Sequence, residues 1–244
     1  MILPLRDTNI DRTITPIVNY LLVAINVIVF VFFQQLGMDE DFTLGYAAVP
    51  KEIVTGKDVV TNDEKVYDKG SGEYYTVPGL KETPKPVYIT LLTSMFMHGG
   101  IAHIIGNMLF LLIFGDNIEN RIGHWRYLIF YLVCGVIASL AHVVSTYMFD
   151  LNPLVPSLGA SGAISGVLGG YILLFPGNRV TVLMFNFLTD VPAFVALGIW
   201  FVFQLISGLG MLGGELGGVA YGAHIGGFIA GLVLIKIFEI GRSS

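Results

Sequence analysis

The sequence predicts an all-α membrane protein with six membrane-spanning helices and a long polar loop between the first two. Of its 244 residues, 54% are hydrophobic and 13% are charged, whereas a soluble domain has about 25% charged residues. The hydrophobic residues are gathered into runs of about 18 or more with almost no charge, which is typical of bilayer-spanning helices. Thirty glycines, with few loops to hold them, indicate closely packed helices.

The first run follows Arg6 and Arg12, as the core of a signal peptide would. It exceeds the typical signal core of about 7–15 residues, and no small-x-small cleavage site follows it, so we interpret it as a retained span. The second run is short and has a polar approach, which predicts that its outer end lies in protein or water. The predicted spans are approximately 15–36, 99–116, 127–149, 158–176, 192–210 and 217–240.

The polar segment 37–86 holds ten of the eighteen acidic residues and six lysines. Fifty residues with so little apolar content cannot build much of a core, so we expect an elaborated extracytoplasmic loop of a single domain, 1–244. Within this loop, Val66 to Val77 surrounds a Lys-Gly-Ser-Gly turn and predicts a small hairpin. The segment can be a solvated loop or can bind a partner, and the sequence leaves that open.

Basic residues in the short loops predict that both chain termini are cytoplasmic. We expect the membrane to be that of a prokaryotic cell. The net charge of -5, without a basic stripe, argues against nucleic acid as a partner. The single cysteine, Cys134, rules out an intramolecular disulfide framework and is interpreted as a small core residue. The residues that place the termini inside are Arg6, Arg12, Arg121, Arg126, Arg179, Lys236 and Arg242.

Polar residues within spans are costly and are therefore functional candidates. With the N-terminus inside, spans two, four and six all begin at the outer surface. His103 and Asn107 lie near the start of span two, Ser161 near the start of span four, and His224 near the start of span six. Each lies roughly 5–10 Å below that start at 1.5 Å per residue, so the four share one depth.

Small residues on spans four and six suggest that these two helices also lie next to each other. Residues 159–170 and 222–231 carry glycine, alanine or serine at spacings of four. Two such faces can pack backbone to backbone and bring Ser161 within reach of His224. The usual meaning of such faces is packing alone, and that reading stays open here.

Three serines at spacings of four compete as nucleophile. Ser157 follows Pro156, and we expect it to be a helix N-cap, while Ser165 lies one turn deeper. Ser161 lies near a helix N-terminus, where free N–H groups favour a developing negative charge. The commoner fate of a helical serine is a hydrogen bond to the carbonyl four residues back.

A serine hydroxyl needs a base at neutral pH, and His224 is the candidate. No acidic residue lies at the shared depth of spans two, four and six, so we predict a Ser–His dyad. His103 and Asn107 are four residues apart on one helix face. With the Ser161 N–H they can donate to the oxyanion of a tetrahedral intermediate, or they can be a satisfied polar pair between helices.

Three motifs together resemble the rhomboid family over residues 87–235. They are His98, His103 and Asn107 on span two, Gly-Ala-Ser-Gly at 159–162, and Ala223-His224 followed by Gly227 on span six. The resemblance implies a six-helix core, Ser161 and His224 as catalytic residues, and His103, Asn107 and Ser161 as oxyanion donors.

By the same resemblance, a second set of residues supports the structure: His98, Gly159, Gly162 and Gly227, with a tight inner turn at Glu119, Arg121 and Gly123. The chain departs from the family in two places. Ile89-Thr90 replaces a Trp-Arg pair of the first loop, and Ser165 replaces an aromatic residue that stacks on the catalytic histidine in some members. We therefore expect another residue to hold His224.

The function predicted from these observations is intramembrane serine endopeptidase activity on transmembrane protein substrates. The cut would lie near the outer end of a substrate helix, in contact with the lipid bilayer, with a gate at loop 208–218. We expect no cofactor and no metal, because His98 and His103 are five apart without the intervening glutamate of a zinc signature. The alternatives are an inactive relative that binds membrane helices and a small-solute transporter. The latter would need charged midplane residues or an internal repeat.

Overall fold

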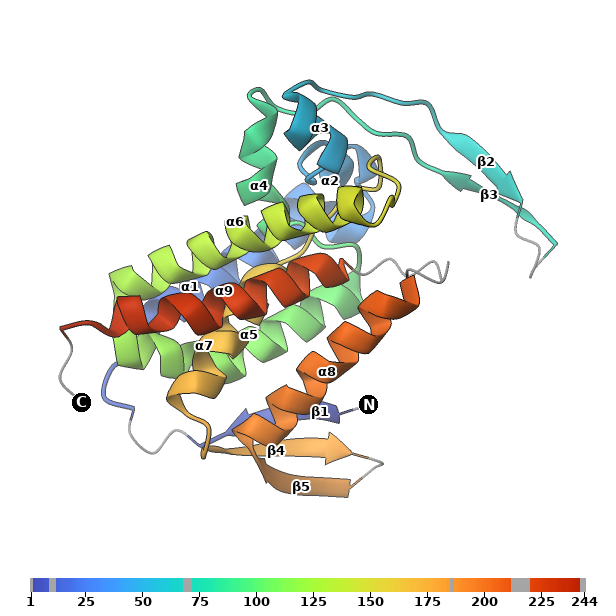
Figure 1. Cartoon of the computed structure of the whole chain (residues 1–244). Coiled ribbons are helices and arrows are strands. Elements are labelled where there is room, and N and C mark those ends of the chain that lie inside the picture. The colour runs from blue at the N-terminus through green and yellow to red at the C-terminus, as the bar shows by residue number, and fades with distance from the viewer. Residues whose placement is uncertain (1, 9–11, 68–71, 185–186, 212–219, 242–244) are drawn as a thin grey trace.

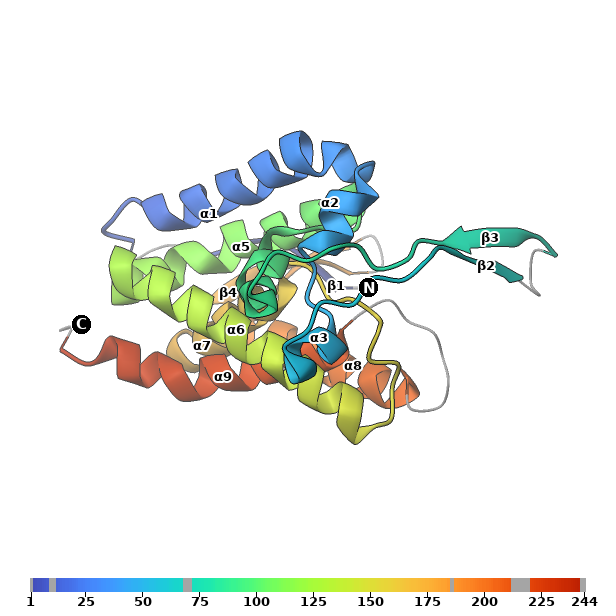
Figure 2. The ribbon, with the colours of Figure 1, turned by 90° about the horizontal axis from the view of Figure 1, so that it is seen from above.

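The computed structural model describes residues 2–8, 12–67, 72–184, 187–211 and 220–241, and this part is mostly helical (Figure 1). Seen from above, α1 lies at one edge of the bundle beside α5, and α9 lies at the opposite edge beside α6 (Figure 2). The longer helices are α1 (Ile17–Ile28), α5 (Ile101–Ile122), α6 (His124–Met148), α7 (Ser161–Leu174), α8 (Ala193–Met211) and α9 (Tyr221–Glu239).

Three of the described helices, α5, α6 and α9, are long and apolar enough to cross a membrane. Four further apolar helical stretches among the described residues have only 10–17 residues: Ile17–Phe33, Val87–Phe96, Ser161–Leu174 and Ala193–Gly208. Helix α1 is extended by a π-helical turn at Val29–Phe33, while α7 has only 14 residues. The expectation of six spans therefore remains a prediction for the shorter helices, which lie beside the three long ones in Figure 1.

Helix α7 is the centre of the bundle because α5, α6 and α9 all pack against it. Every residue from 162 to 171 is buried. A Cβ added at Gly227 of α9 would overlap the carbonyl oxygen of Gly162, and one added at Gly231 would overlap that of Gly166. The two backbones therefore touch, which is the contact that the small-residue spacing predicts. Gly162 also packs closely against α6. A Cβ added at Gly162 would lie 2.8 Å from the Cβ of Ala138.

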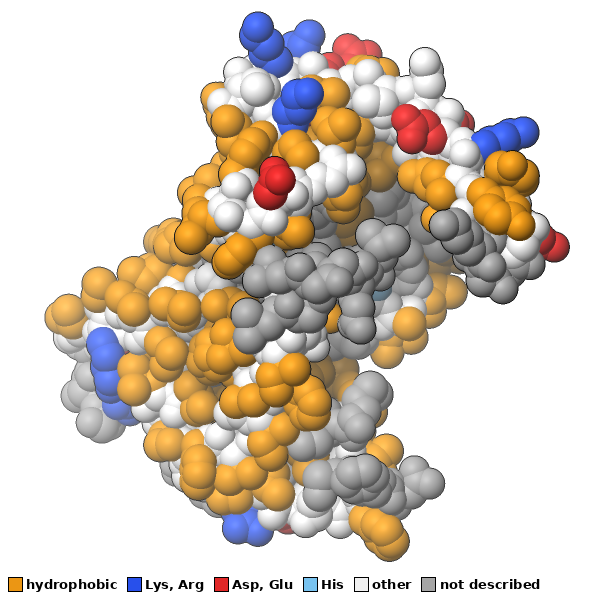
Figure 3. Space-filling model, turned by 45° about the vertical axis from the view of Figure 1, so that its right-hand side comes forward, with side chains coloured by type: hydrophobic (Ala, Val, Ile, Leu, Met, Phe, Trp, Pro, Cys, Tyr) orange, Lys and Arg blue, Asp and Glu red, His pale blue; other side chains and the backbone are white. Residues whose placement is uncertain are grey.

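Segment 37–86 consists of short elements joined by loops at one end of the bundle. Two strands, β2 (Glu64–Tyr67) and β3 (Tyr74–Val77), pair antiparallel in the stretch where the sequence predicts a hairpin, and they project away from the helices (Figure 1). The expected turn at 68–71 lies outside the described residues. Most charged side chains on the face shown in Figure 3 gather over this end, and the bundle below is largely hydrophobic. The short helices of this region are α2 (Glu40–Gly45), α3 (Pro50–Thr55) and α4 (Thr90–Thr93), with 3-10 turns at Gln35–Gly37, Val87–Ile89 and Ser94–Phe96.

The chain is not purely α-helical, because a three-stranded antiparallel sheet accompanies the bundle. Its order is β1 (Ile2–Asp7), β4 (Arg179–Met184), β5 (Phe187–Pro192), with Leu3 opposite Leu183 and an irregularity between Pro4 and Arg6. The alternation of Val180, Thr181 and Val182 puts both valines in the core and is the period-two pattern of a strand. The expectation of an all-α fold is corrected to that extent.

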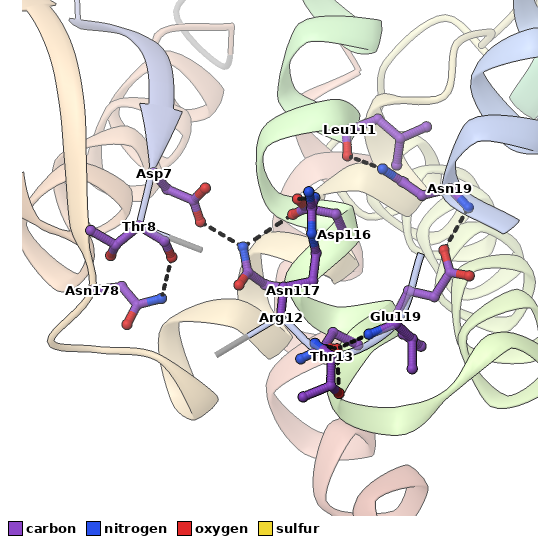
Figure 4. Close-up of polar contacts among 12 residues, drawn as sticks. Asp7, Thr8, Arg12, Thr13, Asn19, Leu111, Asp116, Asn117, Glu119 and Asn178 are labelled. Atoms are coloured by element: carbon purple, nitrogen blue, oxygen red, sulfur yellow. Dashed lines mark hydrogen bonds and ion pairs between the residues drawn. The ribbon is translucent and has the colours of Figure 1, made fainter. Parts of the chain in front are cut away.

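Polar contacts tie the N-terminal segment to the C-terminal ends of α5 and α7, and several of them are drawn in Figure 4. The Asp7 carboxylate accepts hydrogen bonds from Asn117 Nδ2 at 2.7 Å and from the Tyr171 hydroxyl. Arg12 pairs with Asp116 at 2.9 Å. The buried Glu119 carboxylate accepts from the backbone N–H groups of residues 18 and 19, at 2.9 and 2.7 Å, and so caps the start of α1. A single residue, Gly123, joins α5 to α6 at a φ of 83°, where the family resemblance implies a tight turn.

Candidate active site

The predicted site residues lie at the starts of three helices. Ser161 is the first residue of α7, His224 lies on the first turn of α9, and His103 and Asn107 occupy the first two turns of α5. The hydroxyl Oγ of Ser161 lies 2.7 Å from Nε2 of His224. This is hydrogen-bond distance, and it is the geometry in which an imidazole can take the proton of an attacking hydroxyl.

The backbone contact between α7 and α9 explains why these two side chains meet. Gly162 follows Ser161, and Gly227 lies one turn after His224, so one of the close backbone contacts between the two helices adjoins both side chains. With larger residues at these positions the helix axes would separate and the hydroxyl would lose its contact with the ring. The small-residue faces therefore do serve packing, and the packing sets the distance between Ser161 and His224.

The other two serines of the stripe have different surroundings. The Ser165 hydroxyl donates to the carbonyl oxygen of Ser161 at 2.6 Å, which is the ordinary fate of a helical serine. The expectation that Ser157 is the helix N-cap is wrong. Ala160 occupies that position, and the Ser157 backbone instead pairs with Ala48 in an isolated antiparallel bridge, with N–O distances of 2.8 and 2.9 Å. An N-cap must directly precede the first helical residue, and three residues separate Ser157 from Ser161.

The His103 ring and the Asn107 side chain flank the backbone just before Ser161. A Cβ at Gly159 would lie 2.9 Å from His103 Cε1 and Nε2 and 3.7 Å from Asn107 Nδ2. Gly159 has a φ of 120°, so only glycine suits both the backbone and the space. Its N–H donates to the Ser94 carbonyl at 2.9 Å, which holds the chain against the first loop.

His103 and Asn107 line the cavity, and each has an N–H group that can donate a hydrogen bond. His103 Nδ1 accepts from the Gly99 N–H at 3.3 Å, so in the neutral ring the proton is on Nε2. Asn107 is buried, and within the described residues its Nδ2 has no hydrogen-bond partner. As the first residue of α7, Ser161 also offers a backbone N–H that the helix itself does not use. His103, Asn107 and Ser161 therefore bring three donors from two helices to the lining of one cavity.

A cavity of about 580 Å³ connects these groups. It is mostly apolar, which limits the water that surrounds any charge formed there. Within the described residues, no three metal-binding side chains come together that could hold a metal ion. The polar side chains that line the cavity include His103, Asn107, His142, Ser161, Gln204 and His224.

His98 is fully buried next to His103. Its ring meets Phe30 and His103 edge to face, at centroid distances of 6.4 and 5.2 Å. The side chain of Gln34 clamps its backbone, since Gln34 Oε1 accepts from the His98 N–H at 2.9 Å and Gln34 Nε2 donates to its carbonyl at 2.8 Å. Sequence reasoning missed Gln34, although a polar residue that ends an apolar helix was a usable signal.

Gln204 of α8 is the second residue that sequence reasoning missed. Its Oε1 lies 2.8 Å from Nδ1 of His224, and Trp200, one turn earlier, lies 6.2 Å from the same ring between centroids. It was overlooked because the depth argument used only the spans that begin at the outer surface. Gln204 stands between Phe203 and Leu205 in an apolar run, so it was a functional candidate for the same reason as the other polar residues within spans. The proposed gate loop, 208–218, lies largely outside the described residues.

Comparisons with known proteins show what the chain is similar to. The Rhomboid domain family matches residues 85–239. The Rhomboid protease GluP of Bacillus subtilis is 35% identical over 56% of this chain and 26% of its own length. Rhomboid protein 1, mitochondrial, of Saccharomyces cerevisiae is 31% identical over 59% and 40%, and RHOMBOID-like protein 12, mitochondrial, of Arabidopsis thaliana is 33% identical over 63% and 47%.

The chain thus spans less than half the length of each of these three relatives. The matching part begins at residue 85, before His98, and ends with α9. It therefore contains His98, His103, Asn107, Ser161 and His224 in one domain. Since the match takes in well over half of the chain, this protein belongs to the rhomboid family.

Proposed function

We propose that this protein is an intramembrane serine endopeptidase that cuts transmembrane helices of substrate proteins near their outer end. The observation that carries the proposal is the 2.7 Å contact between Ser161 Oγ and His224 Nε2, at a cavity that residues of α5, α6, α7, α8 and α9 line. The match to a protease of the same family supports it. A protein that only binds membrane helices would gain nothing from a hydroxyl and an imidazole held in this way.

In the proposed reaction, His224 Nε2 takes the hydroxyl proton while Ser161 Oγ attacks the scissile carbonyl carbon. The carbonyl oxygen becomes an oxyanion, which accepts hydrogen bonds from His103 Nε2, Asn107 Nδ2 and the Ser161 N–H. The protonated His224 then gives its proton to the leaving amine as the peptide C–N bond breaks, which leaves an acyl-enzyme. Water, deprotonated by the same histidine, attacks the ester and releases the second product with the serine restored.

The proposed substrate follows from the depth of the site. A helical backbone hides its scissile carbonyl in the i to i−4 hydrogen bonds, so a substrate helix must unwind locally before Ser161 can reach it. Helix-weakening residues such as glycine near the cut lower the cost of unwinding by about 1 kcal/mol each. Transmembrane proteins with such residues near their outer ends are therefore the proposed substrates.

For the topology, we propose an integral membrane protein with six spans and with both termini in the cytoplasm of a prokaryotic cell. The positive-inside rule supports this orientation, because Arg121 and Arg126 flank the short turn between α5 and α6. The outer side then carries the charged 37–86 segment. On this assignment, the starts of α5, α7 and α9 all face the outside, from which the water for hydrolysis enters.

The test is cleavage of a model transmembrane substrate in liposomes by the wild type, Ser161→Ala and His224→Ala. We expect cleavage by the wild type and a loss of about 10³-fold or more in both variants. Equal cleavage by all three would sink the proposal for this site. If none cleaves, labelling with a fluorophosphonate probe separates an unsuitable substrate from an inactive helix-binding protein. A wild type that is labelled at Ser161 supports the protease, and a wild type that is not labelled supports the binding protein.

A further inference from the structure

Both ring nitrogens of His224 are held in this structure, and by different helices. Nε2 lies 2.7 Å from Ser161 Oγ on α7, and Nδ1 lies 2.8 Å from Gln204 Oε1 on α8. We propose that Gln204 is a positioning residue for the reaction and takes the place that a carboxylate has in a Ser–His–Asp triad. This inference rests on the proposed function, because it concerns how the proposed base is held.

The chemistry of the two contacts determines where the proton of the neutral ring lies. An amide oxygen can only accept a hydrogen bond, so Nδ1 must carry the proton when it faces Gln204 Oε1. A neutral imidazole has one N–H, and Nε2 therefore keeps a free lone pair toward the Ser161 hydroxyl. Without Gln204, either nitrogen can carry the proton, and the tautomer with a proton on Nε2 cannot act as a base toward Ser161.

Aromatic packing fixes the part of α8 that carries Gln204 next to His224. Trp200 and Gln204 are four residues apart and so share one face of α8. The Trp200 ring lies 6.2 Å from His224 and 6.2 Å from Phe228 between centroids. Phe201 stacks on Phe228 at 4.3 Å with an angle of 21° between the rings. Phe228 lies one turn after His224, so aromatic packing holds α8 against α9 next to the contact between Gln204 and the ring.

An uncharged acceptor suits this location. A carboxylate at the same place would have to be removed from water in an apolar cavity, and only the imidazolium would offset the lost hydration. An amide at the same distance orients the ring at lower cost and stabilises the imidazolium less. The Gln204 contact therefore explains how His224 can be oriented without an acidic third residue. It also replaces the stacking that an aromatic residue at position 165 would provide.

The first experiment compares cleavage by the wild type, Gln204→Met and Gln204→Glu in liposomes. Methionine keeps the size and removes the acceptor, and we expect kcat to fall about 10- to 100-fold with KM nearly unchanged. Glutamate restores an acceptor oxygen, so it should restore most of kcat. It should also move the acidic limb of the kcat–pH profile to higher pH, because a carboxylate favours the protonated ring. His103 and His142 face the same cavity, and both are unchanged in every variant.

Leu205→Ala is the matched control, because Leu205 is the next residue of α8 and is partly exposed. It should leave kcat and the pH profile as they are. A purely structural role of Gln204 would lower thermal stability in both Gln204 variants without a shift of the pH profile between them. Wild-type kcat in Gln204→Met, with an unchanged profile, would overturn the proposal.

The second experiment does not depend on activity. Ring ¹⁵N chemical shifts of His224 distinguish a proton on Nδ1 from one on Nε2. We expect the Nδ1–H tautomer in the wild type and a mixture in Gln204→Met, even in the inactive Ser161→Ala background. An Nε2–H tautomer in the wild type would refute the role of Gln204. If the tautomers behave as expected but the wild type neither cuts a substrate nor is labelled at Ser161 by the fluorophosphonate probe, the proposed function fails and the contact between Gln204 and His224 stands.

Discussion

Gly227 of α9 lies directly against the carbonyl oxygen of Gly162 in α7, with no room for a Cβ between them. Each glycine adjoins one member of the proposed dyad, since Ser161 precedes Gly162 and His224 lies three residues before Gly227. The contact therefore links helix packing to the geometry of the site. Changes at this contact should therefore affect both stability and activity.

Gly227→Ala should lower the free energy of unfolding by about 1–3 kcal/mol, because the added methyl group forces the two backbones apart. Cleavage should fall as well, since the same displacement lengthens the contact between Ser161 and His224. Gly198→Ala is the control, because a Cβ at Gly198 of α8 meets nothing within 4 Å. Thermal unfolding in detergent and cleavage in liposomes measure both effects. Equal behaviour of the two variants would contradict the packing argument.

Asn107→Ala should lower kcat by about 10²- to 10³-fold with little change in KM, because it removes a donor that acts on the oxyanion. Stability should hardly change, since Asn107 Nδ2 has no partner to lose among the described residues. Ile105→Ala, on an exposed face of α5, serves as the control. If Asn107 were only a polar packing residue, its alanine variant would unfold at a lower temperature and keep its kcat.

Gln34→Ala should destabilise the protein by about 2–6 kcal/mol. It leaves two buried backbone groups of His98 without their partners, and each unsatisfied group costs about 1–3 kcal/mol. The neighbouring Gln35 is exposed and its side chain donates an exposed hydrogen bond to Asp39, so Gln35→Ala should change stability by less than about 0.5 kcal/mol. Urea or thermal unfolding of the two variants in parallel would show the difference. No difference between them would mean that the Gln34 clamp is unimportant.

The stability of the wild type should decrease as the pH rises through the range in which Asp7 ionises. Burial raises the pKa of the Asp7 carboxyl from 3.8 to about 7, and the nearby Asp116 charge adds to the effect. The folded state therefore binds the proton more tightly than the unfolded state, and this contribution is complete below pH 3.8 and lost as the pH approaches 7. At 1.36 kcal/mol per unit, the loss has an upper limit of about 4 kcal/mol.

Asp7→Asn should flatten this dependence. An amide oxygen still accepts from Tyr171 and Asn117 and never ionises, so the variant should gain stability relative to the wild type as the pH rises. Asp150→Asn, at an exposed position, is the matched control and should keep the wild-type profile. The measurement is the unfolding temperature from pH 4 to 8, taken as the difference between each variant and the wild type. A constant difference would show that Asp7 does not titrate in this range.

Part of the fold and of the candidate site could be predicted from the sequence because single helices carry their own signals. A run of apolar residues predicts a membrane helix whatever surrounds it, and α5, α6 and α9 are of that kind. Ser161 and His224 were found because small residues around each predict close packing and their depth follows from helix length. The sheet was missed because strands β1 and β4 lie more than 170 residues apart, and neither is long enough to be recognised alone.

The sequence by itself determined the family, the membrane composition and the candidate pair Ser161 and His224, because these depend on local pattern and spacing. Only the tertiary structure decided which residues hold that pair. Gln204 reaches His224 because α8 leans on α9 through aromatic rings, and Gln34 reaches His98 because α1 passes behind the first loop. Contacts of this kind depend on how helices cross in space, and the amino-acid sequence of either helix alone contains no periodic signal of its partner.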